Sequence, residues 1–225
     1  MKQLRISLFN SLASENLKDI TIDGLELTLD SALSDGIIKE IPIIGSLYKS
    51  IKAAKGISEA IFTKKIFRFL FELKTVPQED REKFFKKLEN DENYSEKVGE
   101  KLLIILEQFD DIDKPALLGK LLKQVIEGKF TMDEFFRISS VIQRSYLPDL
   151  ILICRSNRIL QYKPEVREHL INLGLFKTIL DDGIQIARIK DSAGLGSKSH
   201  VPEPSIHYEI SLLGEKIRKF LNDCA

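Results

Sequence analysis

The segment Gly128–Leu150, GKFTMDEFFRISSVIQRSYLPDL, contains the clearest helix start in this chain. Gly128 lacks a Cβ and can therefore adopt the positive φ that ends a preceding helix. Thr131 and Glu134 have the Thr-x-x-Glu spacing of a capping box, in which each side chain binds the backbone N–H of the other residue. The segment therefore predicts the end of one helix, a tight link and the start of a second helix.

After this start, apolar residues recur at the 3.6-residue period of a helix. They are Phe135, Ile138, Val141, Ile142 and Tyr146. Pro148 then either kinks this helix or begins a new one. Similar periods precede the segment, as in Val98, Leu102, Ile105, Leu106 and Phe109. We therefore predict a mainly α protein, a multi-helix bundle over 1–130 with a small α+β module over 131–225 packed on it.

The first 75 residues give weaker signals. Residues 1–12 fit a short helix or a strand, and residues 16–33 fit both, although their helical neighbours favour a helix. Pro42 is placed as a first helical residue, and Gly56 as the end of that helix. Ser58 is placed to cap the next helix. The apolar face of that helix comprises Ile61, Phe62, Ile66, Phe69, Leu70 and Leu73.

Two neighbouring stretches carry opposite charge. Residues 36–74 contain eight Lys or Arg and three Glu, a net charge of +5, whereas residues 79–113 contain six basic and twelve acidic residues, a net charge of −6. The first stretch indicates either core helices with a solvated Lys face, an anionic membrane surface site or a partner surface. Its candidate contact residues are Lys49, Lys52, Lys55, Lys64, Lys65 and Arg68. The second stretch indicates solvated helix faces or charge matching within or between chains.

The C-terminal third changes character. Short helices over 148–159 and 164–173, the second closed by Gly174, precede a predicted hairpin over 175–189 that turns at Asp181-Asp182-Gly183. A Gly/Ser/Pro-rich loop over 191–204, a strand SIHYEIS and a final helix with a cap at Ser211 follow. The order is therefore helix, helix, helix, strand, loop, strand, helix.

This order, with HLINLGLFKTI and YEISLLGEKIRKFL, resembles the bacterial winged-helix family over about 85 residues. The motif positions are Gly174, Leu175, Tyr208, Ile210, Ser211 and Gly214, with Ile210 and Ser211 standing where the family has Leu and Thr. The resemblance implies a winged-helix fold that binds DNA through its third helix and wing.

The charges of the module argue against a simple transfer of DNA binding. The candidate nucleic-acid contacts are Arg167, Lys190 and Lys198. Glu165 and Glu168 share the expected recognition helix with Arg167, and carboxylates repel the phosphates on which affinity rests. A winged-helix fold used for protein contacts is at least as consistent with this sequence.

The stretch from residue 36 to 150 also resembles small helical proteins of bacteria and phages with no assigned activity, some encoded beside antiphage defence genes. The wording that carries this resemblance is IPIIG, KKIFRFLFEL and LLGKLLKQVIEGKFTMDEFF. It implies a bacterial origin and a defence or regulatory context, and it implies no chemistry.

Motifs for catalysis, cofactors and metals are not found in the sequence. His169 is expected to pack as a structural side chain, Cys154 to be a buried thiol, and the acidic cluster 110–113 to link two helices. With no secretory or membrane-spanning segment, a cytoplasmic location is expected. The first hypothesis is a non-enzymatic protein without cofactor that binds a protein partner or itself. The alternatives are a membrane-surface effector using residues 36–74 and a DNA-binding regulator.

Overall fold

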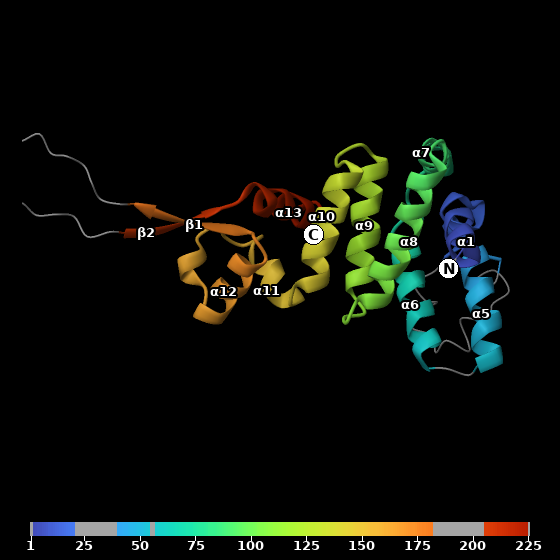
Figure 1. Ribbon diagram of the computed structural model, residues 1–225, viewed down its shortest axis with the longest axis horizontal. Coiled ribbons are helices and arrows are strands. Elements are labelled where there is room, and N and C mark those ends of the chain that lie inside the picture. Colours follow the sequence, from blue (N-terminus) through green and yellow to red (C-terminus); the bar gives the residue numbers. More distant parts are fainter. Residues whose placement is uncertain (1, 21–39, 55–56, 182–204, 225) are drawn as a thin grey trace, which may run out of the picture. The chain divides into compact units, whose positions relative to one another are not determined.

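The structure, a computed structural model, describes residues 2–20, 40–54, 57–181 and 205–224. It is mainly α-helical, with a small two-stranded antiparallel sheet near the C-terminus (Figure 1). The fold class predicted from the sequence is therefore confirmed. The described residues form two compact units, 1–144 with Cys224 and 145–223.

The first unit contains α1 (Lys2–Ala13), the 3₁₀ helix η1 (Glu15–Asp19), α5 (Pro42–Ala54), α6 (Ile57–Phe71), α7 (Gln78–Glu89), α8 (Glu92–Gln108), α9 (Lys114–Ile126) and α10 (Met132–Arg144). Helix α6 packs along α9, and α1 packs against α5, α7 and α8 (Figure 1). Helix α10 packs on α9 and α8, burying Phe135, Ile138, Val141 and Ile142. The units thus divide after Arg144, one helix later than the predicted boundary, because the apolar face of α10 belongs to the bundle core.

The helix start predicted at Thr131 is confirmed. Gly128 has φ +77°, and the N–H groups of Gly128 and Lys129 donate to the carbonyls of Val125 and Gln124, which closes α9 in a Schellman motif. The N–H of Thr131 donates to the Glu134 carboxylate at 2.8 Å, and the N–H of Glu134 donates to the Thr131 hydroxyl at 3.2 Å. The capping box is therefore reciprocal, as its spacing predicts.

Replacing Thr131 by alanine removes the acceptor for the N–H of Glu134. We expect Thr131→Ala to lower the free energy of unfolding by about 1 kcal/mol. Thr131→Ser keeps the hydroxyl and should stay close to the wild type. Chemical denaturation followed by circular dichroism measures both variants, and equal losses for serine and alanine would count against the cap.

Several local expectations for the first unit hold, and others are wrong. Residues 2–13 form a helix, and Pro42 is the first residue of α5. Ser58 lies inside α6, which begins at Ile57, so it is not a cap. Ile61 is 48% exposed and Tyr146 is 65% exposed, so neither belongs to the core. Gly56 and most of the ambiguous segment 16–33 lie outside the described residues.

The ends of α10 and α11 explain the exposure of Tyr146. Helix α10 ends at Arg144, and α11 (Leu147–Leu152) has Pro148 in its first turn. Pro148 therefore begins a new helix rather than kinking α10, because its missing N–H costs nothing in a first turn. In the sequence, Tyr146 falls between the end of α10 and the start of α11. The helical period that would place it on the same face as Phe135 therefore does not extend to it.

The second unit contains α11, the 3₁₀ helix η2 (Ile159–Gln161), α12 (Pro164–Asn172), β1 (Phe176–Asp181), β2 (Ser205–Ile210) and α13 (Leu212–Asn222). Gly174 has φ +75° and ends α12 as predicted. The N–H of Gly214 donates to the Ser211 hydroxyl at 3.0 Å, so the cap of α13 is confirmed. In the described residues β1 pairs with β2, and residues 182–189 of the predicted hairpin lie outside them.

Two buried contacts of the first unit have no signal in the periodic pattern. The Arg81 side chain is only 2% exposed, and its guanidinium donates to the carbonyls of Leu12, Ser14 and Val76. Gly119 lies so close to α6 that a Cβ there would be 2.4 Å from the carbonyl oxygen of Phe69. Arg81 thus ties the end of α1 to α7, and Gly119 permits the close approach of α9 to α6.

Candidate functional site

An open cleft of about 600 Å³ lies within the first unit. It is formed by α7, the first turn of α8, and the link between α9 and α10. Its lining residues are Asp80, Lys83, Phe84, Lys87, Leu88, Asp91, Tyr94, Val125, Ile126, Gly128, Phe130, Thr131 and Met132. We call this feature the α7–α10 groove. Such concave, mostly apolar surfaces are the usual binding sites of globular proteins.

The apolar lining of the groove is graded from floor to rim. Leu88, Val125 and Phe130 are buried and form its floor, at 8%, 6% and 7% exposure. Phe84, Ile126 and Met132 are half-buried, and Tyr94 at the rim is 42% exposed. The groove therefore presents apolar area that the bundle itself leaves partly uncovered.

Local sequence explains why this apolar area faces outward. Phe84 and Phe85 are adjacent on α7, so their side chains point about 100° apart and only one can face the core. Phe85 is 3% exposed in the core, and Phe84 turns to the groove, with the two rings edge to face at 5.2 Å. The turn at Gly128 then brings Phe130 to the same groove. The groove thus forms where the outward-facing Phe84 of α7 lies near the Phe130 that follows the turn at Gly128.

One lip of the groove carries four exposed charges. In chain order they are Asp80, Lys83, Lys87 and Asp91, with signs −, +, +, −. The Lys83 ammonium is 3.8 Å from the Glu79 carboxylate on the same exposed helix face. One oxygen of Asp91 accepts the N–H of Tyr94 at 3.0 Å and caps α8. The lip is therefore exposed to solvent, and its charges follow one another in the order −, +, +, −.

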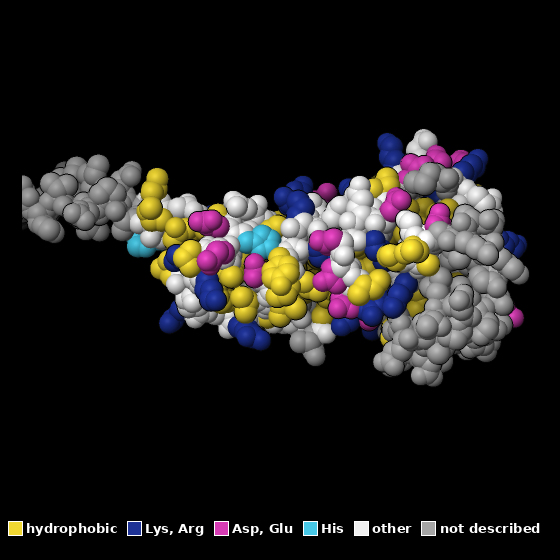
Figure 2. All heavy atoms as spheres, turned by 90° about the horizontal axis from the view of Figure 1, so that it is seen from below, with side chains coloured by type: hydrophobic (Ala, Val, Ile, Leu, Met, Phe, Trp, Pro, Cys, Tyr) yellow, Lys and Arg dark blue, Asp and Glu magenta, His cyan; other side chains and the backbone are white. Residues whose placement is uncertain are grey.

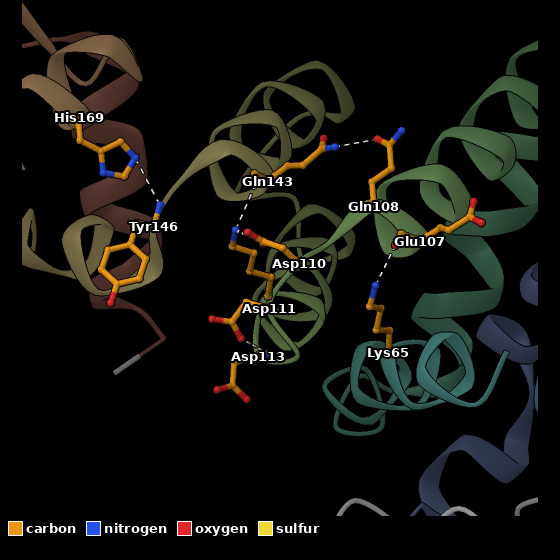
Figure 3. Close-up of polar contacts among 10 residues, drawn as sticks. Lys65, Glu107, Gln108, Asp110, Asp111, Asp113, Gln143, Tyr146 and His169 are labelled. Carbon is orange, nitrogen blue, oxygen red and sulfur yellow. Dashed lines mark hydrogen bonds and ion pairs between the residues drawn. The ribbon is translucent and has the colours of Figure 1, made fainter. Parts of the chain in front are cut away.

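The predicted basic surface is partly used inside the bundle. Lys65 is 8% exposed, and its ammonium donates to the carbonyl of Glu107 at 2.8 Å (Figure 3). Burial lowers the pKa of Lys65, which the charges of Glu107 and Asp110 oppose. Arg68 forms an ion pair with Asp113. Charge matching between the two oppositely charged stretches therefore occurs within the chain, at least at Arg68.

The other candidate residues of the basic surface differ in their surroundings. Lys49 is exposed and Lys64 is half-buried. The side chains of Lys52 and Lys55 lie outside the described part of the structure. On the face drawn in Figure 2, basic side chains lie among acidic ones. Among the described candidates, Lys65 and Arg68 have partners within the first unit, and a membrane or partner surface on this stretch stays a prediction.

The acidic cluster is a link between α8 and α9, as predicted. The Lys114 ammonium, on a side chain only 2% exposed, donates to the Asp110 carboxylate at 2.6 Å and to the carbonyl of Gln143 at 3.1 Å. The hydrogen bond from Lys114 holds the pKa of Asp110 below its usual range. Gln143 and Gln108 join through their amides at 2.7 Å (Figure 3). The link thus holds the C-terminal end of α10 against α8 and α9.

Metal-ligating side chains do not gather in the described residues. No group of three or more His, Cys, Asp or Glu side chains there is placed to hold a metal ion. Within the acidic cluster, Asp111 accepts the N–H of Asp113 at 2.8 Å, and Asp113 pairs with Arg68. These carboxylates are held by the chain's own donors.

His169 is half-buried in the second unit and has a contact at each ring nitrogen, as expected of a packed side chain. Its Nδ1 is 2.8 Å from the Asp149 carboxylate, and its Nε2 accepts the N–H of Tyr146 at 3.3 Å (Figure 3 shows the second contact). Both contacts are satisfied by the neutral tautomer that carries its proton on Nδ1. His169 therefore fixes the entry into α11, whose first turn contains Asp149.

Cys154 is half-buried rather than fully buried. Burial raises the pKa of the Cys154 thiol, an effect that Arg218 opposes. A raised pKa leaves little thiolate at neutral pH, and the thiolate is the reactive form. In the described structure neither Cys154 nor Cys224 forms a disulfide.

The residues that carry the winged-helix resemblance meet at the base of the sheet. The N–H of Ser211 donates to the carbonyl of Leu175 at 2.9 Å, and its hydroxyl donates to the carbonyl of Gly174 at 2.6 Å. A Cβ at Gly214 would be 2.2 Å from the carbonyl oxygen of Leu175. Tyr208 and Ile210 pair across the strands with Thr178 and Phe176. These motif positions therefore shape the junction between α12, the strands and α13.

The candidate nucleic-acid contacts are not brought together in the described residues. Arg167 is half-buried on α12, between the exposed Glu165 and Glu168. Lys190 and Lys198 lie outside the described part of the chain. DNA binding by this module therefore stays a prediction from the resemblance.

Comparison with protein-family models, with curated proteins and with solved structures finds no match to this chain. The winged-helix and phage-protein resemblances stay predictions from the sequence. Among the described helices, none is long and apolar enough to cross a membrane.

The sequence pattern did not identify the α7–α10 groove. Its contributors lie at residues 80–94 and 125–132, and each stretch by itself has the pattern of an ordinary amphipathic helix or helix link. One local signal was available, the pair Phe84-Phe85, because two adjacent bulky residues cannot both face the same core. Residue type alone could not show which of them faces the groove.

Proposed function

We propose that this chain is a protein-binding module whose α7–α10 groove takes up an amphipathic helix of a partner protein. The observation that carries the proposal is the partly uncovered apolar lining beneath a charged lip. Helix-in-groove recognition uses this combination, with apolar anchors at i, i+3 or i+4 and i+7 entering the groove. Tyr94 and Phe84 supply aromatic area of the kind enriched at binding hot spots.

The dimensions of the groove agree with a short helix. Helix α7, which forms one wall of the groove, contains 12 residues and at 1.5 Å per residue is about 18 Å long, or about three helical turns. A three-turn helix presents three or four apolar anchors on one face. The cleft of about 600 Å³ is also within the range of ordinary binding pockets.

The proposal keeps the expectations of a non-enzymatic, cytoplasmic bacterial protein in a defence or regulatory system. Those expectations rest on the sequence alone. A membrane surface and DNA are the alternatives that the sequence leaves open. The groove favours a protein partner over both, because its lining is apolar and its lip has charges of both signs.

Selection from a displayed library of helical peptides tests the proposal. Immobilised full-length protein should enrich peptides with apolar residues at the spacing of one helix face. Tyr94→Glu places a charge at the apolar rim and should weaken their binding roughly tenfold or more. Tyr146→Glu is the matched control, because Tyr146 is exposed, lies outside the groove and should leave binding unchanged.

Two outcomes would overturn the proposal. One is a library from which no helical peptide is enriched. The other is a set of enriched peptides that bind Tyr94→Glu as tightly as the wild type, which would place their site elsewhere. Circular dichroism spectra of both variants verify that each remains folded.

A further inference from the structure

The charges on the lip of the α7–α10 groove specify more than a generic apolar partner. Lys83 and Lys87 are four residues apart, so they lie one above the other on one face of α7. Asp80 precedes this pair by three residues on α7, and Asp91 follows it just beyond the end of α7, as the N-cap residue of α8. The two positive charges are thus flanked by a negative charge at each end.

We infer that the helix bound in this groove carries two acidic residues one turn apart, with a basic residue about one turn beyond each end of that pair. This inference rests on the proposed function and names the chemistry of its partner. Its basis is the −, +, +, − order on the lip, which is complementary to +, −, −, + on a helix lying alongside. Charge patterns of this kind set register and partner choice more than raw affinity.

Other charged groups around the groove leave this pattern in place. Glu79 lies 3.8 Å from Lys83, and both side chains are largely exposed, so water screens their attraction. On the opposite side, Glu127 and Lys129 pair with each other at 2.9 Å. The α9–α10 side of the groove is lined by Val125, Ile126, Gly128, Phe130, Thr131 and Met132, which carry no charge. The sign order that a partner meets is therefore set by the α7 lip.

The same pattern argues against the matching lip of a second copy as the occupant. The order −, +, +, − reads the same in both directions. Two lips aligned side by side would therefore place lysine opposite lysine and aspartate opposite aspartate, whether the helices run parallel or antiparallel. Like charges facing each other oppose association. The inferred occupant is therefore a helix with the order +, −, −, + and not another copy of this lip. The charges fix its register and leave its direction to the apolar anchors.

Two synthetic helical peptides of equal composition test the inference. Both carry the same apolar face, two glutamates and two lysines. The first has the glutamates in the centre and the lysines at the ends, and the second has these positions exchanged. Fluorescence anisotropy with the full-length protein gives the two dissociation constants at low and high salt.

We expect the first peptide to bind about tenfold more tightly than the second at low salt, since four weak pairs change sign between them. The difference should shrink at high salt, because exposed charges are screened. The variant Lys83→Glu with Lys87→Glu should abolish the preference, because each peptide then makes two favourable and two unfavourable pairs. The variant Lys86→Glu with Lys97→Glu has the same change in net charge at exposed residues outside the groove, so it should keep the original preference.

Several results separate the inference from the proposal on which it rests. Equal binding of both peptides, abolished by Tyr94→Glu, overturns the charge inference and leaves the groove as a binding site. A preference that survives Lys83→Glu with Lys87→Glu also overturns it. Binding of neither peptide overturns the proposed function as well. Sedimentation that reveals dimers sensitive to Tyr94→Glu would instead identify a second copy as the occupant.

Discussion

Arg81→Leu should lower the free energy of unfolding of the first unit by about 3–5 kcal/mol. The guanidinium of Arg81 donates at 2.6 Å to Leu12, at 2.9 Å to Ser14 and at 3.2 Å to Val76, in each case to the backbone carbonyl. Leucine leaves these carbonyls without their charged donor, and a buried acceptor without a donor costs far more than the net value of one hydrogen bond.

Two further variants separate this effect from a general loss of charge. Arg81→Lys keeps the charge but cannot direct several fixed N–H groups at three carbonyls, so it should fall between the wild type and Arg81→Leu. Arg137→Leu removes an exposed arginine whose partner Asp133 lies one turn away, and it should leave the unfolding midpoint nearly unchanged. Urea denaturation at neutral pH measures all three. Equal stability of Arg81→Leu and Arg137→Leu would contradict the assigned role.

Gly119→Ala should destabilise the protein by about 2 kcal/mol, although alanine is the better helix former. A Cβ at this position would lie 2.4 Å from the carbonyl oxygen of Phe69 and 2.9 Å from the Cβ of Glu72. The carbonyl oxygen of Phe69 is a backbone atom of α6, and the Cβ of Glu72 is bonded directly to the backbone just after α6. Neither atom can rotate out of the way, so α6 and α9 must move apart. That movement loosens the packing of Phe69 and Leu118, which are fully buried.

The test is whether Gly119→Ala lowers or raises the free energy of unfolding. At an exposed position in the middle of a helix, glycine is less stable than alanine by about 1 kcal/mol. The pair Ser140→Gly and Ser140→Ala measures this preference, because Ser140 is exposed within α10. If Gly119→Ala stabilised the protein as Ser140→Ala does relative to Ser140→Gly, the close approach of α6 and α9 would be contradicted. Thermal unfolding followed at 222 nm compares the variants.

Local chemistry made much of the fold predictable. The capping box at Thr131, the Schellman turn at Gly128 and the cap at Ser211 depend on residues at most five positions apart, so the sequence contains all their partners. The same holds for Pro148 at the start of α11, because a proline constrains its own backbone. The mainly α class follows from the sum of such signals.

The predictions were wrong where burial or a helix boundary depends on the packing of neighbouring helices and not on the local sequence. Ser58 has the residue type of a cap, but α6 begins before it, since side chain type does not fix the first helical residue. Ile61 continues the apolar period of α6, yet no other helix covers it and it remains 48% exposed. Cys154 lies in an apolar run and is nevertheless only half-buried. The period shows which residues share a face and leaves open how far the neighbouring helix extends.

The partners of the basic side chains were also not predictable from the local sequence. Lys65 and Arg68 belong to a basic stretch that predicts a surface. In the structure Lys65 is buried and donates to the carbonyl of Glu107, whereas Arg68 pairs with the exposed carboxylate of Asp113. Those partners lie 42 and 45 residues away in the chain. No pattern within the basic stretch could identify them. The same separation hides Arg81, whose acceptors at Leu12 and Ser14 lie 69 and 67 residues away.

The sequence by itself determined several helix boundaries, among them those at Gly128, Thr131, Pro148, Gly174 and Ser211, because they depend on short-range hydrogen bonds and backbone preferences. It also determined that α-helices dominate and that the last third contains a small mixed module. Only the tertiary structure decided which cations are buried, that α10 belongs to the bundle, and that Phe84, Tyr94 and Met132 line one groove. Each of these depends on the packing of segments distant in the chain. Burial and shape arise from such packing, whereas a helix start depends on its own few residues.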